Sequence, residues 1–142
     1  MRILIGLITI LAGLPALGGI YLLYKLTDLP TGAVIVIVNA IVFRGICGTA
    51  GGVLFWRRSR WGSYLTALSW LYMITVSFMT IIKLYNSGLT LDAEFISHNF
   101  STFGKPLAWS AAKIILGIPI IYYITSVIFK KGSADRKADH SD

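Results

Sequence analysis

The polar and apolar positions of the chain fall into long separate blocks. Four runs of mostly apolar residues cover 3–24, 33–56, 62–85 and 106–129, and polar connections separate them. An α-helix needs about 20 apolar residues to cross about 30 Å of hydrocarbon, and each run reaches that length. The pattern predicts an all-α fold: an integral membrane protein built as an antiparallel four-helix transmembrane bundle.

Connection lengths and composition define the expected domain. Residues 57–60, RRSR, form so short a link that the second and third runs must be antiparallel neighbours. The link at 25–32 ends in a Pro-Thr-Gly turn signal. We therefore predict one four-span transmembrane domain over residues 1–130. Residues 131–142 are polar, lack large apolar side chains and are predicted to be a disordered cytoplasmic tail.

The third connection, residues 86–105, is the longest and carries a helical signal. Thr90 is a candidate N-cap, and acidic residues follow in the first turn at Asp92 and Glu94. A mostly apolar face then follows at helical spacing, formed by Phe95, Ile96, Asn99, Phe100 and Phe103. This favours a short amphipathic helix on the outer membrane surface, with an ordinary lid over the bundle as the alternative.

Composition narrows the class of protein further. Hydrophobic residues make up 56% of the 142 residues and charged residues only 13%, well below the ~25% usual in soluble domains. The net charge of +7 would suit a nucleic-acid partner, but the basic residues flank the apolar runs. We expect contacts with the lipid bilayer and its anionic lipids, and no nucleic acid. The residues placed to make these contacts are Arg57, Arg58, Arg60, Lys130 and Lys131.

The distribution of basic residues also predicts the orientation. Eight Lys and Arg residues lie near the N-terminus, in 57–60 and in the C-terminal segment, whereas only three lie at the opposite ends of the runs. Basic residues concentrate on the cytoplasmic side of membrane proteins. Both termini are therefore predicted in the cytoplasm, and the expected location is the inner (plasma) membrane of a bacterium.

Small residues and prolines predict where the helices meet and bend. Lipid tails are as apolar as leucine, so helices associate in membranes through close packing of small residues. The second run offers Gly48 and Gly51 for such a contact, and each of the other runs also has small residues at helical spacing. Pro15 and Pro119 lie inside runs, where each should kink its helix by removing a backbone donor.

Arg44 is the most informative single residue because it lies near the middle of the second run. A charged side chain there costs at least about 2.5–3.5 kcal/mol, so a partner should offset it. Its helical face holds Gly48 and Gly51, and no run contains Asp or Glu. Three kinds of partner stay open. They are backbone carbonyls freed by a proline kink or hydroxyls of the third run, an acidic group of another subunit, and an anion or lipid headgroup.

Two further polar residues interrupt the runs. Lys113 is expected in the outer half of the fourth run, seven residues from its start, where it either extends toward water or pairs with Asp92 or Glu94. Asn39 is a candidate for a hydrogen bond between helices. It lies about 140° around a regular helix from Arg44, so the two are not expected to share a site.

No catalytic arrangement is visible in the sequence, and we expect no enzyme activity. Cys47 is the single cysteine and both histidines lie outside the runs, so we expect no metal and no cofactor. Two functional hypotheses follow. The first is a non-enzymatic accessory or assembly subunit that packs against another membrane protein or against itself. The second is a small anion or lipid-headgroup transporter or channel that uses Arg44 and Lys113.

Overall fold

The structure, a computed structural model, describes residues 1–26, 29–88 and 93–138. Within these ranges the chain is helical and contains no strand. In chain order the elements are α1 (Arg2–Lys25), α2 (Thr31–Asn39), the π-helix η1 (Ala40–Ile46), α3 (Cys47–Trp56), α4 (Arg60–Asn86), α5 (Ala93–His98), the π-helix η2 (Phe100–Gly104) and α6 (Lys105–Ala138). Four stretches of helix in this part of the chain are long and apolar enough to cross a membrane: Arg2–Lys25, Thr31–Trp56, Arg60–Asn86 and Phe100–Phe129.

Prolines and one residue in the left-handed region explain several features of the helices and their boundaries. Pro30 precedes the first residue of α2 in an extended conformation, and its missing N–H costs nothing there. Arg58 has a φ of 60° between α3 and α4, in the left-handed region that reverses the chain tightly. Pro15 and Pro119 lie inside α1 and α6 without ending them.

The fourth span begins earlier than the sequence pattern indicates. The predicted start was residue 106, but η2 leads directly into α6, so the helix begins at Phe100. Phe100 and Phe103 therefore belong to this span, and α5 is the helix that the described part of the third connection contains. The predicted cap Thr90 and Asp92 lie outside the described residues. The sequence predicts a disordered tail over 131–142, whereas α6 continues as helix to Ala138, and residues 139–142 are not described.

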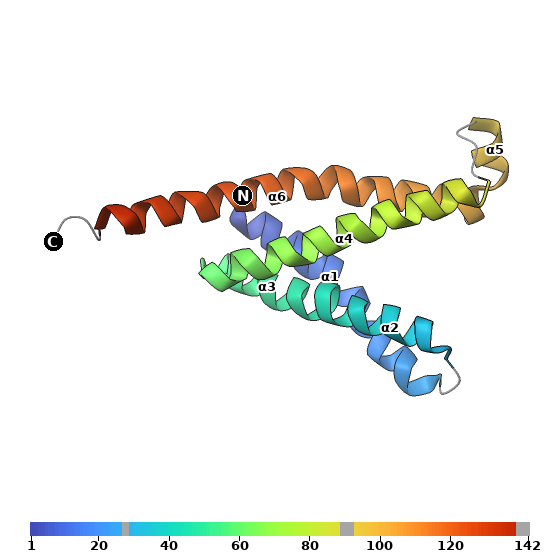
Figure 1. Ribbon diagram of the computed structural model, residues 1–142, viewed down its shortest axis with the longest axis horizontal. Helices are drawn as coiled ribbons and strands as arrows, with labels where there is room; N and C mark the ends of the chain where they lie inside the picture. The colour runs from blue at the N-terminus through green and yellow to red at the C-terminus, as the bar shows by residue number, and fades with distance from the viewer. Residues whose placement is uncertain (27–28, 89–92, 139–142) are drawn as a thin grey trace.

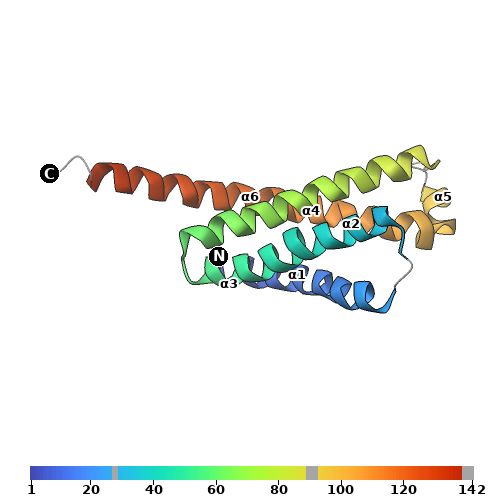
Figure 2. The same ribbon diagram turned by 60° about the horizontal axis from the view of Figure 1, so that its bottom comes forward.

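Four of the helices pack one against the next, in the order α1, α3, α4 and α6. α3 contacts both α1 and α4, and α4 contacts α6. Figure 1 shows that the helices lie together at the end that holds the N-terminus and the α3–α4 link, which we call the closed end. Toward the other end they diverge into two arms, one of α1 with α2 and one of α4 with α6. Figure 2 shows the same helices turned, with α5 at the end of the second arm.

Buried apolar side chains hold the closed end and the middle together. The core cluster contains Ile5, Phe55, Trp70, Met73, Ile120 and Ile124, contributed by α1, α3, α4 and α6. The indole N–H of Trp70 donates to the Thr9 hydroxyl at 2.9 Å, and that hydroxyl donates to the Ile5 carbonyl at 2.7 Å. The contact between α1 and α4 therefore has both an apolar and a hydrogen-bonded component.

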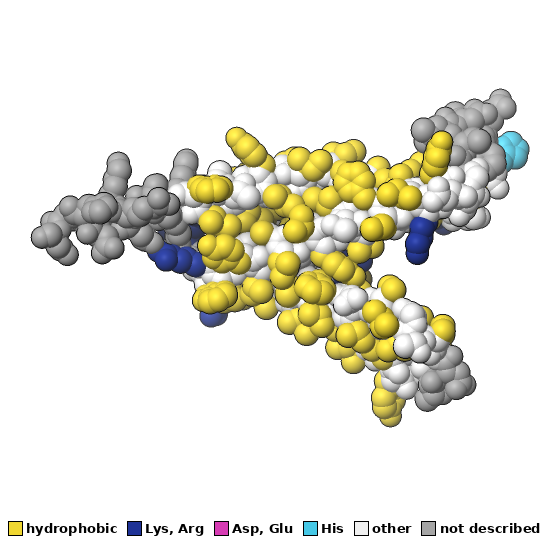
Figure 3. Space-filling view, viewed as in Figure 1, with side chains coloured by type: hydrophobic (Ala, Val, Ile, Leu, Met, Phe, Trp, Pro, Cys, Tyr) yellow, Lys and Arg dark blue, Asp and Glu magenta, His cyan; other side chains and the backbone are white. Residues whose placement is uncertain are grey.

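Most of the apolar surface of the spans faces outward. Only 17–28% of the most apolar window of each span is buried. Figure 3 shows apolar side chains spread over both arms and an open notch between them. A surface of this kind is unfavourable in water, because monomeric soluble proteins rarely expose apolar patches above a few hundred Å².

Candidate functional site

Arg44 is held by the first helix through its backbone. The Nε–H of Arg44 donates to the carbonyl oxygen of Ala12 in α1 at 2.8 Å. Ala12 lies one turn before Pro15, in the part of α1 where the proline ring crowds the preceding carbonyls. The partner of Nε is thus a backbone carbonyl near Pro15, one residue after Leu11, whose carbonyl loses its N–H donor to the proline. The terminal Nη groups have no hydrogen-bond partner within the described part of the chain.

The backbone around Arg44 is a π-helix rather than an α-helix. η1 covers Ala40–Ile46 and joins α2 to α3 without a break. π-helical turns are rare, and they occur frequently at functional sites. Because the turn is wider, the angle of about 140° expected between Asn39 and Arg44 on a regular helix does not carry over. Asn39 is the last residue of α2 and is exposed.

A cavity of about 290 Å³ lies beside Arg44 and brings four helical segments together. Arg44 lines it from η1, and Lys113 lines it from α6. The two cations are far apart in the sequence but face one cavity. The rest of the wall is apolar or aromatic and includes Ile8, Leu11, Trp70, Met73, Trp109 and Leu116.

This cavity lies at the middle of the spans. Arg44 is close to the midpoint of Thr31–Trp56, and Met73 is at the midpoint of Arg60–Asn86. The sequence placed Lys113 in the outer half of its span, but the earlier start at Phe100 places it near the midpoint of Phe100–Phe129. Both cations therefore lie at the same depth as the centres of their helices.

Lys113 is half-buried and has an aromatic neighbour. Its Nζ lies over the ring of Trp109, 5.6 Å from the ring centroid, in a cation–π contact. Its charge and that of Arg44 repel each other electrostatically. Asp92 and the side chain of Glu94, the partners considered from the sequence, lie outside the described residues.

Aromatic residues of this site were not identified from the sequence as site residues. The signal that could have identified Trp109 is its spacing of four residues from Lys113, which places the two on one helical face. Tyr72 stacks on Phe43, the residue before Arg44, with ring centroids 5.4 Å apart. No sequence pattern relates Tyr72 to Phe43, because they meet through packing of α4 against η1.

Gly48 and Gly51 lie at helix contacts rather than in the cavity wall. A Cβ on Gly48 would lie 3.0 Å from the Ser69 hydroxyl and 3.4 Å from the Cα of Gly13. A Cβ on Gly51 would lie 2.8 Å from the backbone nitrogen of Thr66. These glycines let α3 approach α1 and α4 closely, and that approach sets the position of η1 beside Ala12.

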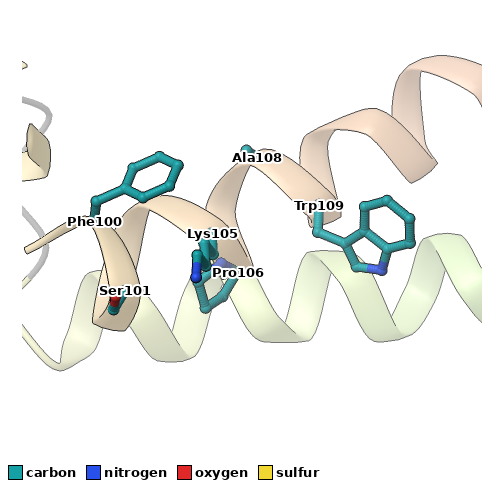
Figure 4. A pocket seen from close by; sticks show the side chains of 6 residues that line it. All are labelled: Phe100, Ser101, Lys105, Pro106, Ala108 and Trp109. Carbon is teal, nitrogen blue, oxygen red and sulfur yellow. The ribbon is translucent and has the colours of Figure 1, made fainter.

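Two other hollows lie at the ends of the spans. One, of about 560 Å³, runs along η2 and the first turns of α6, between Phe100 and Trp109, with Lys105 between them (Figure 4). The other, of about 450 Å³, lies at the closed end and includes Arg2, Trp56 and Arg58. Arg57, Arg58 and Arg60, the predicted lipid contacts, are exposed there. The side chains of Lys130 and Lys131 are not described.

The chemistry available at the mid-span cavity is cationic. Within the described ranges, no group of three His, Cys, Asp or Glu side chains is placed to hold a metal ion. Cys47 is free and half-buried. The charged side chains among the lining residues are a guanidinium and an ammonium, both hydrogen-bond donors. Donors of this kind can form charge-assisted hydrogen bonds to a negatively charged group.

No family model matches the chain, and no curated protein or solved structure shows a significant match to it. We therefore infer the function from the geometry of the cavity.

Proposed function

We propose that this protein is an integral membrane transport protein that binds an anionic group between Arg44 and Lys113 and moves it through the bilayer. The observation that carries the proposal is the meeting of these two cations in one mid-span cavity. No Asp or Glu lies within the four spans. An anion is the partner that would offset both charges at once.

The energetics of the site support a bound anion. One cation at the centre of a bilayer costs at least about 2.5–3.5 kcal/mol. Two cations in one apolar cavity cost more, because each also raises the electrostatic energy of the other. The bond from Arg44 to Ala12 uses only Nε, and the cation–π contact leaves the N–H donors of Lys113 available. A ligand oxygen would accept charge-assisted hydrogen bonds from both side chains.

The membrane arrangement that we propose is the antiparallel four-helix bundle with both termini in the cytoplasm. The supporting observations are the four apolar helices, the short α3–α4 link and the exposed arginines at the closed end. A reporter active only outside the cytoplasm should be inactive when fused after residue 142 and active when inserted after Gly88. Activity at the C-terminal fusion would contradict this orientation.

Anion binding should raise the thermal stability of the purified protein. Ligands that bind only the folded state stabilise it by RT ln(1 + L/Kd), so the stabilisation grows with the free ligand concentration L. We expect at least one soluble anion or anionic lipid to raise the unfolding midpoint of the wild type in detergent. Lys113→Gln should lose this response, whereas Lys83→Gln, which removes an exposed lysine at the end of α4, should keep it. The proposal fails if no anion of either kind stabilises the wild type.

An accessory or assembly subunit is the second candidate function. The observation that favours it is the first arm, where α2 has no buried residue and packs mainly on η1 and α1 within the described residues. A neighbouring membrane helix, from another protein or a second copy, would cover this face. Cysteine placed at the exposed Ile35, with Cys47 replaced by serine, should then cross-link in native membranes. Absence of any cross-linked product would exclude this second function.

A further inference from the structure

We infer that the anionic group is the phosphate of a membrane lipid, which reaches the cavity sideways from the bilayer through the notch between the two arms. The inference rests on the proposed anion site and names its substrate class. Four features of the cavity support it, namely its opening, its lining, its depth and its charge.

The cavity opens toward the side of the protein. Three of its lining residues are largely exposed on the outer surface: Leu11 at 62%, Trp109 at 63% and Leu116 at 52%. They lie at mid-span, where the surroundings of the proposed transmembrane protein are acyl chains. Figure 3 shows the notch between the arms, which widens away from the closed end. A ligand already in the bilayer would reach the cavity without crossing the protein interior.

A route from water at the closed end is blocked by packing. Ile5, Phe55 and Ile124 are buried there in one cluster contributed by α1, α3 and α6. The wall of the cavity itself is apolar apart from its two cations and the indole N–H groups. A hydrated inorganic ion would have to shed its water against hydrocarbon, at high cost. A lipid tail, in contrast, would be favoured by contact with the same apolar surface.

The depth of the site indicates a lipid in transit. The hydrocarbon core is about 30 Å thick, so a lipid resting in either leaflet keeps its phosphate about 15 Å from the midplane. The cavity lies at the midpoints of the spans. Its volume of about 290 Å³ lies near the lower limit of ligand pockets, about 300–1,000 Å³, and suits a headgroup rather than a whole lipid. A headgroup at this depth is between leaflets, so the transported species is the lipid.

The charge of the site favours a phosphate monoester. Arg44 and Lys113 together carry two positive charges. A phosphate monoester carries about 1.5–2 negative charges at neutral pH, which nearly balances both cations. A phosphodiester or a carboxylate carries one negative charge and would leave one cation unbalanced. Phosphatidate, with an exposed monoester, is the simplest lipid of this class.

The test is a transbilayer movement assay in proteoliposomes. Fluorescent phosphatidate and fluorescent phosphatidylcholine, both labelled on an acyl chain, are reconstituted separately, and dithionite destroys only the label in the outer leaflet. With the wild-type protein, nearly all labelled phosphatidate should become accessible to dithionite. Labelled phosphatidylcholine should cross between the leaflets much more slowly. Arg44→Gln and Lys113→Gln should each slow phosphatidate at least about tenfold, and Lys83→Gln should not. Efflux of entrapped radiolabelled inorganic phosphate is measured in parallel.

A steric variant keeps the test decisive if the charge variants fold poorly. Leu116→Trp adds bulk at the exposed rim of the cavity and should slow phosphatidate movement, with both cations intact. Leu71→Trp, at an exposed residue of α4 that does not line the cavity, is its matched control. Equal rates for these two variants would overturn the lateral route.

The remaining outcomes separate this inference from the proposed function. Arg44-dependent efflux of inorganic phosphate without movement of phosphatidate would overturn the lipid substrate and leave the anion site intact. Equal movement of phosphatidate and phosphatidylcholine would overturn the selection for a phosphate monoester. Movement of neither species, together with no thermal stabilisation by any anion, would overturn both the inference and the proposed function.

Discussion

Replacing Arg44 with methionine should abolish anion binding and leave the folded protein at least as stable as the wild type. Methionine keeps the long unbranched side chain but removes the charge. The loss of the hydrogen bond to Ala12 costs about 1.5–3 kcal/mol. In the proposed membrane arrangement a cation at this position costs at least about 2.5–3.5 kcal/mol, and its removal also ends the repulsion with Lys113. The difference between the two terms runs from about 0.5 kcal/mol of lost stability to about 2 kcal/mol of added stability, and the end of the repulsion shifts it toward added stability.

Two measurements on the same preparation check this expectation. Unfolding in detergent without added anion gives the free energy, and the shift of the unfolding midpoint with anion gives binding. Arg57→Met, which removes an exposed arginine at the closed end, should keep anion binding. If Arg44→Met instead lost several kcal/mol of stability and still bound anions, Arg44 would be a structural residue that ties η1 to α1. Higher stability with lost function is the pattern expected of a binding residue.

Replacing Gly51 with alanine should destabilise the protein by separating α3 from α4. The added Cβ would lie 2.8 Å from the backbone nitrogen of Thr66 and 3.0 Å from the carbonyl carbon of Leu65. These are backbone atoms, so the contact is relieved only by moving a helix. Such overpacking costs about 1–3 kcal/mol. Unfolding in detergent measures the loss.

Gly18→Ala is the matched control for this substitution. It makes the same chemical change inside α1, but a Cβ there would have no neighbouring atom within 4 Å. Alanine favours helix over glycine by about 0.8–1.0 kcal/mol, so this variant should be unchanged or slightly more stable. Equal effects at the two positions would mean that the close approach of α3 to α4 contributes little to stability.

The long helices could be predicted from the sequence, because the length of each apolar run determines its secondary structure. Four long runs separated by short links leave little choice of secondary structure, and the first three spans lie within a few residues of their predicted bounds. The start of the fourth span was missed because the polar Ser101, Thr102 and Lys105 interrupt the apolar pattern where η2 joins α6. The earlier start also changes the position of Lys113 from the outer half of the predicted run to near the midpoint of Phe100–Phe129.

The site was only partly predictable, for a different physical reason. Arg44 and Lys113 were identified because a charge inside an apolar run is unfavourable and needs an explanation. Their shared cavity depends on how α6 packs against α4 and α1, which no local pattern encodes. The π-helix at Ala40–Ile46 changes the direction of the side chains near Arg44, and sequence analysis at 100° per residue assumes a regular α-helix.

The central claim is that Arg44 and Lys113 face one cavity that holds an anion, and Lys113→Glu tests it most directly. A carboxylate at this position would supply the missing negative charge from the chain itself and pair with Arg44. The predicted result is an unfolding midpoint above that of the anion-free wild type, and no further response to added anion. A lower midpoint than the anion-free wild type, or an undiminished response to anion, would contradict the account.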